Sequence, residues 1–333
     1  MRERPGLVGW LAAALAPLAV AGCITIQTIG WRQPLLETVV EGERGPKVLL
    51  VDIDGIITDV DLEGPFGLPG REGTVARLRE QLDKAADAGD VRGLLLRINS
   101  PGGSVTASDV VYREILAFKE RRRVPVVAML MGVAASGAYY AAMAADVVLA
   151  HPTTITGSIG VISAGVNVSG LMERYGVADQ TIAAGAFKDA GSPLRPMKPA
   201  ERAYLQALVD DLHERFREVV QKGRPGLTPE QVREVSDGRL FSAGQAEALG
   251  LVDGIAYIPE AISELARRLG TTEVRVVAYH REREWRANVY STGPGSAPAS
   301  AADLARRLGI EAGPAFLYLW WPDGLGVPAA LAR

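Results

Sequence analysis

Apolar, strand-like segments alternate with helical segments in the first half of the chain, and this alternation constrains the fold more than any other feature. The runs VRGLLLRI (91–98), VPVVAML (124–130) and DVVLA (146–150) are apolar over most of their length, as in strands buried on both faces. Residues 72–89 and 104–123 have apolar residues at helical spacing. Strands joined by helices predict repeated βαβ units, a parallel sheet and right-handed crossovers.

The surrounding segments extend this core to one α/β domain with a helical flank. KVLLVDIDGIITDV (47–60) is rich in β-branched residues and contains Asp-Gly, so it predicts a strand and a turn. Residues 198–223 carry an apolar stripe at helical spacing, and two shorter helical segments follow within 229–255. We therefore place one domain at residues 46–270.

Segments of different composition flank this domain. Residues 24–45 are mixed and irregular, which indicates a linker, and residues 271–333 form a C-terminal extension to which the sequence assigns no role. Within the extension, STGPGSAPASAAD (near 292–303) indicates a flexible segment. For the apolar AFLYLWWPDG after it, we expect packing in the core in preference to contact with an oligomer or a membrane.

Residues 1–23 have the features of a secretory signal. Positive charges precede an apolar stretch from Leu7 to Ala21, which is short for a membrane-spanning helix and is interrupted by Pro17. The VAGC sequence at its end resembles the lipobox of bacterial lipoproteins, in which the cysteine, here Cys23, is acylated and becomes the mature N-terminus. An uncleaved signal anchor is the alternative. Both place the rest of the chain on the periplasmic side, tethered to a membrane.

Composition argues against several classes of function. A net charge of −3 gives no sign of a nucleic-acid partner. Cys23 is the only cysteine, so no intramolecular disulfide can form. The three histidines, His151, His213 and His280, lack the spacing of a metal site. We therefore expect neither a metal nor a cofactor.

Two turns that follow strands carry the candidate chemistry, because ligands of parallel sheets bind beyond the carboxyl ends of the strands. The first turn, Asn99–Gly103, sets two glycine amides at a predicted helix start. Free amides and the helix dipole attract an anion there, either a phosphate or the oxyanion of a tetrahedral intermediate. An ordinary strand–helix turn is the alternative.

The second turn presents Ser136 between small residues at another predicted helix start. Its unobstructed hydroxyl is typical of a nucleophile elbow, but a serine at this place is also typical of a helix N-cap. A nucleophilic serine needs a base. His151, which ends the next strand, is one candidate, and Lys188 in a Gly/Ala-rich loop is the other. A lysine serves as a base only where burial lowers its pKa, and a solvated loop lysine is the alternative.

Four motifs resemble those of a known family. They are INSPGGSV (98–105), GVAASGAYYAAMAAD (132–146), TGSIGV (156–161) and GAFKDAGSP (185–193). In this order they closely resemble the signal peptide peptidase A family of serine proteases, over residues 47–260. The resemblance implies a fold related to Clp protease and crotonase, and a Ser/Lys dyad. The spacing of the serine and the lysine suits the short, single-repeat form of the family.

The resemblance also implies a role for each motif. Ser136 in AASGA would be the nucleophile, and Lys188 in AFKD its general base. Ser158 in TGSIG would hydrogen-bond the lysine amine, orient it and help to keep it neutral. The amides of Gly103 and Gly137 would form the oxyanion hole.

For partners, the resemblance implies peptide substrates and a ring-shaped or dome-shaped homo-oligomer with active sites shared between neighbours. Lys188 would then act on Ser136 of its own chain or of another. The expected substrates are remnant signal peptides and other short apolar peptides, with small or apolar residues at the cleavage position. His151 would have a structural or surface role. The lipobox departs from the family, whose members usually carry an uncleaved transmembrane anchor.

Two other functions compete with this serine endopeptidase. A crotonase-type acyl-CoA enzyme uses the same oxyanion turns without a serine nucleophile, but coenzyme A is scarce outside the cytoplasm. A catalytically inactive binding lipoprotein is the second alternative. The presence of both Ser136 and Lys188 argues against it.

Overall fold

The computed structural model describes residues 34–61, 72–282, 284, 286–291 and 315–320. The chain divides into Met1–Pro34, of which only Pro34 is described, and a body that begins at Leu35. The predicted signal segment with Cys23 and the predicted flexible segment near 292–303 lie outside the described residues. No helix in the described ranges is long and apolar enough to cross a membrane.

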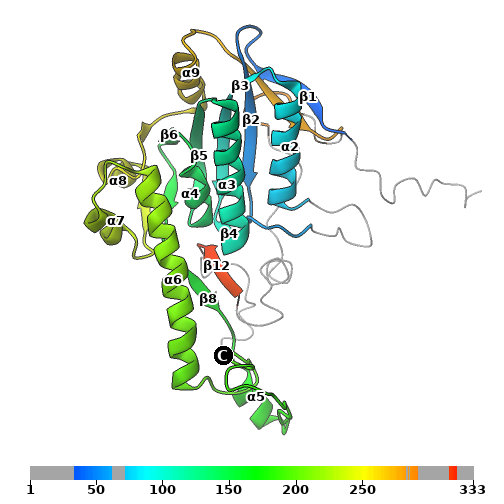
Figure 1. The fold of residues 1–333 in the computed structure, drawn as a ribbon, viewed down its shortest axis with the longest axis vertical. Helices are drawn as coiled ribbons and strands as arrows, with labels where there is room; N and C mark the ends of the chain where they lie inside the picture. Colours follow the sequence, from blue (N-terminus) through cyan, green and yellow to red (C-terminus); the bar gives the residue numbers. More distant parts are fainter. Residues whose placement is uncertain (1–33, 62–71, 283, 285, 292–314, 321–333) are drawn as a thin grey trace, which may run out of the picture. The chain divides into compact units, whose positions relative to one another are not determined.

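A nine-stranded, mostly parallel sheet forms the centre of the body (Figure 1). Seven strands follow the order β1-β11-β2-β3-β5-β6-β10, while β7 pairs with β5 and β9 pairs with β7. Among the described strands of this sheet, β1 and β9 run antiparallel to their neighbours, and the other pairings are parallel. This confirms the predicted α/β class. The strands are β1 (Leu36–Glu41), β2 (Lys47–Asp54), β3 (Val91–Ser100), β5 (Val126–Ala135), β6 (Val147–Ala150), β7 (Ile155–Gly157), β9 (Leu240–Ser242), β10 (Gly254–Ile255) and β11 (Arg275–His280).

A small three-stranded sheet adjoins the carboxyl ends of the central strands. It consists of β4 (Gly102–Ser104), β12 (Ala315–Leu319) and β8 (Ile162–Ala164), in that order. β4 follows β3 after a single residue, which fixes the small sheet next to the large one. β12, drawn in red in Figure 1, is antiparallel to both of its neighbours.

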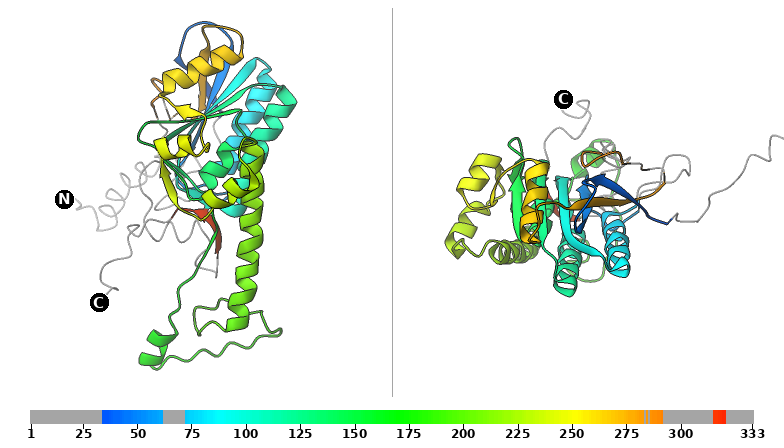
Figure 2. Two further views of the ribbon diagram at one scale, coloured as in Figure 1. Left: turned by 90° about the vertical axis from the view of Figure 1, so that its left-hand side faces the viewer. Right: turned by 90° about the horizontal axis from the view of Figure 1, so that it is seen from above.

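Helices cover both faces of the large sheet (Figure 2). Of these, α2, α3 and α4 pack on one face, and α9 packs on the other. The helices are α2 (Thr74–Ala88), α3 (Val105–Arg122), α4 (Gly137–Ala142), α5 (Ser169–Arg174), α6 (Pro199–Gly223), α7 (Pro229–Val235), α8 (Ala243–Ala248) and α9 (Ile258–Arg268).

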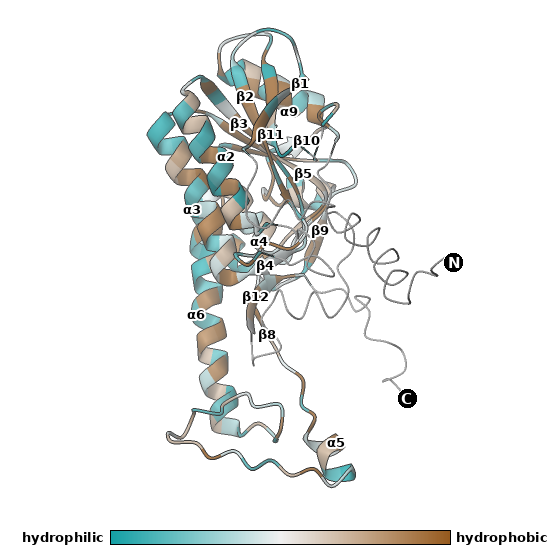
Figure 3. Ribbon diagram, turned by 90° about the vertical axis from the view of Figure 1, so that its right-hand side faces the viewer, coloured by the Kyte–Doolittle hydropathy of each residue, from teal (hydrophilic) through white to brown (hydrophobic). Residues whose placement is uncertain are grey.

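The central strands consist largely of hydrophobic residues (brown in Figure 3), and these are buried on both faces of the sheet, as the sequence predicts. Along β2, Leu49 and Val51 join the apolar cluster on the α2–α3 side, whereas Val48 and Leu50 join the cluster that includes Leu265 of α9. Successive side chains of a strand point to opposite faces, so an uninterrupted apolar run is what a two-sided sheet needs. This burial holds the strand ends in place for the turns that follow them.

Two strands of the large sheet lie outside the domain predicted at residues 46–270. β1 occupies part of the predicted linker 24–45, and β11 lies in the predicted C-terminal extension. The two pair with each other, Val39 opposite Val277, and β11 also pairs with β2. Because the partners are so far apart in sequence, no local pattern reveals the pairing.

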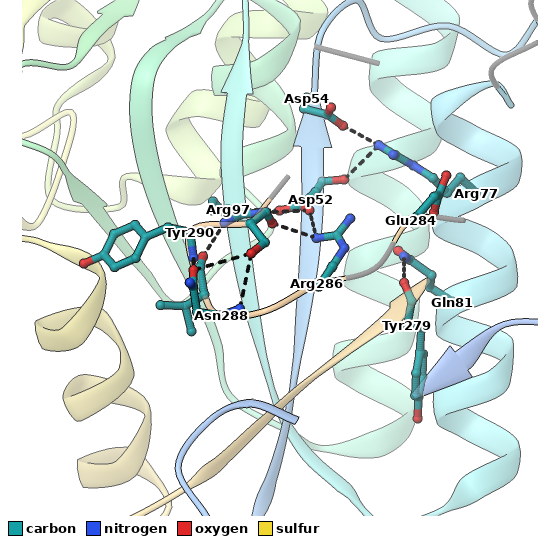
Figure 4. A network of polar contacts seen from close by, with 12 residues as sticks. Asp52, Asp54, Arg77, Gln81, Arg97, Tyr279, Glu284, Arg286, Asn288 and Tyr290 are labelled. Atoms are coloured by element: carbon teal, nitrogen blue, oxygen red, sulfur yellow. Dashed lines mark hydrogen bonds and ion pairs between the residues drawn. The ribbon is translucent and has the colours of Figure 1, made fainter. Parts of the chain in front are cut away.

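A buried cluster of charges fastens the segment after β11 to the sheet (Figure 4). Arg97 of β3 donates to both carboxylate oxygens of Asp52 of β2, at 2.7 and 3.0 Å. Arg286 binds the same carboxylate. Arg97 also donates to the carbonyls of Val289 and Ser291, the latter at 2.7 Å. One carboxylate thus binds two buried guanidinium groups.

Replacing this acid should destabilise the protein strongly. Asp52→Asn leaves Arg97 and Arg286 without a buried counter-charge, and we expect the free energy of unfolding to fall by about 3–5 kcal/mol. The control is Asp83→Asn, which removes an exposed ion pair with Arg79 (2.8 Å) and should cost less than about 1 kcal/mol. Urea unfolding of both variants measures the difference. Equal losses would contradict a supporting role for Asp52.

Candidate active site

Ser136 lies between β5 and α4 with a strained backbone. Its φ of 54° and ψ of −119° fall outside the regions that non-glycine residues favour. The Ser136 amide donates to the Gly157 carbonyl (2.8 Å), and the Ser136 carbonyl accepts from the Tyr140 amide (2.9 Å). The hydroxyl makes no capping hydrogen bond to α4, so the N-cap alternative finds no support. A strained serine between strand and helix is the geometry of a nucleophile elbow.

The Pro-Gly-Gly turn lies against the Ser136 turn, because β3 and β5 are parallel neighbours. A Cβ atom on Gly102 would lie 2.8 Å from the Gly137 nitrogen. A Cβ atom on Gly103 would lie 1.9 Å from the Ile57 carbonyl oxygen, so a side chain does not fit there. The two glycine-containing turns predicted from the sequence therefore meet at one place on the sheet edge.

The glycines of the first turn precede the helix instead of beginning it. Gly102 and Gly103 belong to β4, and α3 begins at Val105. Ser104 caps this helix by accepting a hydrogen bond from the Ala107 amide (3.2 Å). The helix thus begins within one residue of its predicted start at Ser104, and the two glycines lie in β4 just before it.

Ser158 lies beside Ser136. It follows β7, whose last residue, Gly157, pairs with Ala135 and accepts the hydrogen bond from the Ser136 amide. Ser158 is 8% exposed, has a φ of 49°, and donates its amide to the Arg239 carbonyl (2.8 Å). The structure thus brings three of the four motifs together around one serine.

Lys188 is not brought to Ser136 within one chain. It lies on the segment 165–198, which the ribbon shows at the far end of α6 from α4 and β4 (Figures 1 and 2). The Lys188 side chain is exposed, and its amide donates to the Gly185 carbonyl (3.2 Å). Among the described residues, no hydrogen bond links it to Ser136 or Ser158.

The acid next to Lys188 is already engaged. Arg195 donates to the Asp189 carboxylate (2.7 Å) and to the Glu201 carboxylate (2.6 Å). These hydrogen bonds lower the pKa of both acids below their ordinary values. Asp189 therefore stays charged and paired with Arg195.

His151, the other candidate base, has different neighbours. Its Nδ1 lies 2.9 Å from the Thr153 hydroxyl, and its ring packs edge-on against Tyr257 at a centroid distance of 5.0 Å. These contacts fit the structural or surface role that the family resemblance implies for it.

The structure adds one residue that the sequence analysis does not place at the site. Tyr318 of β12 has its carbonyl oxygen 3.0 Å from the position that a Cβ atom on Gly137 would take. Its side chain is fully buried, which confirms core packing for this part of the predicted extension. The apolar run was visible in the sequence, but its partner strands were not.

The strain at Ser136 predicts an unusual effect of glycine on stability. A positive φ costs a non-glycine residue about 1–3 kcal/mol, and glycine adopts it without that cost. Both Ser136→Gly and Ser136→Ala remove the hydroxyl, so the difference in stability between them reports the cost of the positive φ. We expect the glycine variant to have the higher free energy of unfolding in urea, by about 1 kcal/mol. An alanine variant of equal or greater stability would show that the backbone here is unstrained.

Comparison with known proteins relates this chain to a family. A model of peptidase family S49 matches residues 118–272, and a model of the Clp protease family matches residues 71–156. Among solved structures, a ClpP1 variant from Listeria monocytogenes aligns with a TM-score of 0.42 at 18% identity, covering 64% of this chain and 93% of that one.

Two relatives show the similarity in sequence. The "Putative signal peptide peptidase SppA" of Enterococcus faecium is 36% identical over 247 residues, which are 74% of this chain and 70% of the relative. The chloroplastic serine protease SPPA of Arabidopsis thaliana is 32% identical over 218 residues, 65% of this chain and 32% of the relative. With its α/β fold and its four motifs, the chain belongs to the signal peptide peptidase A family of serine peptidases, peptidase family S49.

Proposed function

We propose that the chain is a serine endopeptidase in which Ser136 attacks a peptide carbonyl and the amides of Gly103 and Gly137 bind the oxyanion. The observation that carries the proposal is that the two turns meet. Ser136 has a strained backbone and its hydroxyl does not cap α4, and the backbone of Gly102 packs closely against that of Gly137. Fixed amides aimed at a developing negative charge are often the largest contribution to acyl-transfer catalysis. Membership of a serine peptidase family favours this reaction over acyl-CoA chemistry or mere binding.

Lys188 is the proposed general base. It takes the proton of the Ser136 hydroxyl as the serine oxygen bonds to the carbonyl carbon, and it gives this proton to the departing amine. A water molecule then attacks the acyl-enzyme and passes a proton to Lys188, which returns it to the serine oxygen as the carboxylic acid product leaves. Ser158 is proposed to orient the amine, which its place beside Gly157 and Ser136 supports.

We further propose that Lys188 acts on Ser136 of a second copy of the chain. The segment 165–198, which carries Lys188, and the start of α6 expose many large apolar side chains. Clustered exposed apolar residues are typical of a protein–protein interface. Lys188 lies on an exposed segment, and Ser136 lies in a buried turn on another part of the chain. An interface in which the Lys188 segment of one copy packs against the Ser136 turn of the next would bring the two together. The exposed side chains are Val166, Leu171, Tyr175, Val177, Ile182, Phe187, Leu194, Met197 and Tyr204.

The proposed substrates are remnant signal peptides and other short apolar peptides at a membrane. The lipobox-like sequence at Cys23 supports a lipid anchor that would hold the domain on the periplasmic side. The name of the Enterococcus relative supports the substrate class.

Mixing two inactive variants tests the dyad and its sharing at once. Ser136→Ala and Lys188→Ala should each lower the hydrolysis of apolar fluorogenic peptides by at least about 1000-fold, because each removes a reacting group. After co-refolding at equal amounts, about one quarter of the wild-type activity should return. In that mixture, an intact serine meets an intact lysine at one interface in four.

His151→Ala is the matched control and should keep wild-type activity, since His151 contacts Thr153 and Tyr257. Two inactive variants that give no activity when mixed would place the dyad within one chain. Full activity of Lys188→Ala would overturn the assignment of the base.

A further inference from the structure

Lys188 lies between two residues that are each connected to the start of α6. Phe187, on one side, packs its ring against that of Tyr204 of α6 at a centroid distance of 5.3 Å. Asp189, on the other side, accepts a hydrogen bond from Arg195 (2.7 Å), and this arginine is itself bound to the first turn of α6. The loop that carries the proposed base is therefore held to the helix through both neighbours of the lysine.

Arg195 makes the more extensive of these two connections. Its guanidinium donates to both carboxylate oxygens of Glu201, at 2.9 and 2.6 Å. It also donates to the carboxylate of Asp189 at 2.7 Å and to the carbonyl of the same residue at 3.1 Å. The Glu201 side chain is 1% exposed, so removal of Arg195 would leave a buried carboxylate without its bidentate partner.

The loop has little else to hold it within one chain. No residue of the segment 165–198, which the structure describes in full, is buried. Local main-chain hydrogen bonds shape the loop, such as those from the Ala190 amide to the Phe187 carbonyl (3.2 Å) and from the Ser192 amide to the Asp189 carbonyl (3.0 Å). A segment without buried apolar contacts opens at low cost in free energy. The position of the lysine therefore depends on contacts such as those of Arg195.

Arg195 also engages the acid that is next to the lysine in sequence. A carboxylate that approaches the amine stabilises the protonated lysine, and a protonated lysine cannot accept the proton of a serine. In the part of the chain that the structure describes, Lys188 forms no ion pair, and Asp189 is paired with Arg195. The guanidinium thus holds the carboxylate while it holds the loop.

We propose that Arg195 is a positioning residue for the proposed base. It fixes the Lys188 loop to the first turn of α6, and it keeps the Asp189 carboxylate from pairing with the lysine amine. Arg195 acts through these two residues and not by contact with the substrate. This inference rests on the proposed function.

Steady-state kinetics test the positioning role. Arg195→Ala should lower kcat for apolar fluorogenic peptides about 100-fold and leave KM within about twofold, because a displaced base slows the reaction without weakening substrate binding. Arg195→Lys keeps the charge but lacks the planar fork that binds two carboxylates, so it should recover only part of kcat. The matched control, Arg267→Ala, removes a two-bond pair with Glu264 on α9 (2.8 and 2.7 Å) and should keep wild-type constants. Wild-type constants for Arg195→Ala would overturn the proposal.

Mixing variants shows which half of the proposed dyad Arg195 serves. Co-refolded with Ser136→Ala, Arg195→Ala should regain about one quarter of wild-type activity, because one interface in four joins an intact serine to an intact lysine loop. Mixed with Lys188→Ala it should regain none, since neither chain then has an intact loop. The regained activity also shows that Arg195→Ala chains fold and assemble. The opposite pattern would overturn the proposal, as would no recovery under conditions where Ser136→Ala and Lys188→Ala complement each other.

The pH profile tests the role of the charge, and it does so whether or not the dyad is shared between chains. In Arg195→Ala the freed Asp189 carboxylate favours the protonated base, so the acid limb of kcat/KM should move to higher pH by about one unit. Adding Asp189→Asn to the same chain should return the limb toward its wild-type position. The other charged groups that face this cluster, Asp179, Lys198 and Glu201, stay in every variant. A limb that does not move, or that Asp189→Asn does not return, would overturn the proposed control of Asp189.

Amide hydrogen exchange separates this inference from the proposed function. If Lys188→Ala is fully active while exchange in residues 185–192 quickens in Arg195→Ala, the arginine fixes the loop and the assignment of the base fails. If Lys188→Ala is inactive while Arg195→Ala has wild-type activity and unchanged exchange, the assignment of the base stands and the role of Arg195 is overturned.

Discussion

The carboxyl end of β5 is held between β3 on one side and β7 on the other, and the candidate site depends on this double pairing. Each neighbour ends in one of the motifs, the Pro-Gly-Gly turn after β3 and Ser158 after β7. Parallel strands bring their carboxyl ends to one edge of the sheet, so motifs that are distant in sequence converge on Ser136. The hydrogen bond from the Ser136 amide to Gly157 fixes the serine in this frame.

The two halves of the proposed dyad differ in how the fold supports them. A positive φ at a serine persists only where the surroundings determine the backbone, and Ala134, Ala135 and Ala138 around Ser136 are fully buried. Lys188 lies on an exposed segment instead, held by local turns and by the Arg195 ion pairs. The proposed nucleophile is thus preorganised by the core of its own chain. The proposed base would gain a comparable environment from a second copy, if the dyad is shared between chains as proposed.

The sequence was sufficient for the parts of the fold that local patterns encode. Apolar runs buried on both faces identified β3, β5 and β6, and small residues around Ser136 identified the strand–helix turn. The pairing of β1 with β11 and the position of β12 between β4 and β8 were not predictable, because the sequence of a short strand does not indicate which strand it pairs with. The four motifs named the candidate site residues, but no pattern in the sequence reveals that Lys188 lies apart from Ser136 within one chain.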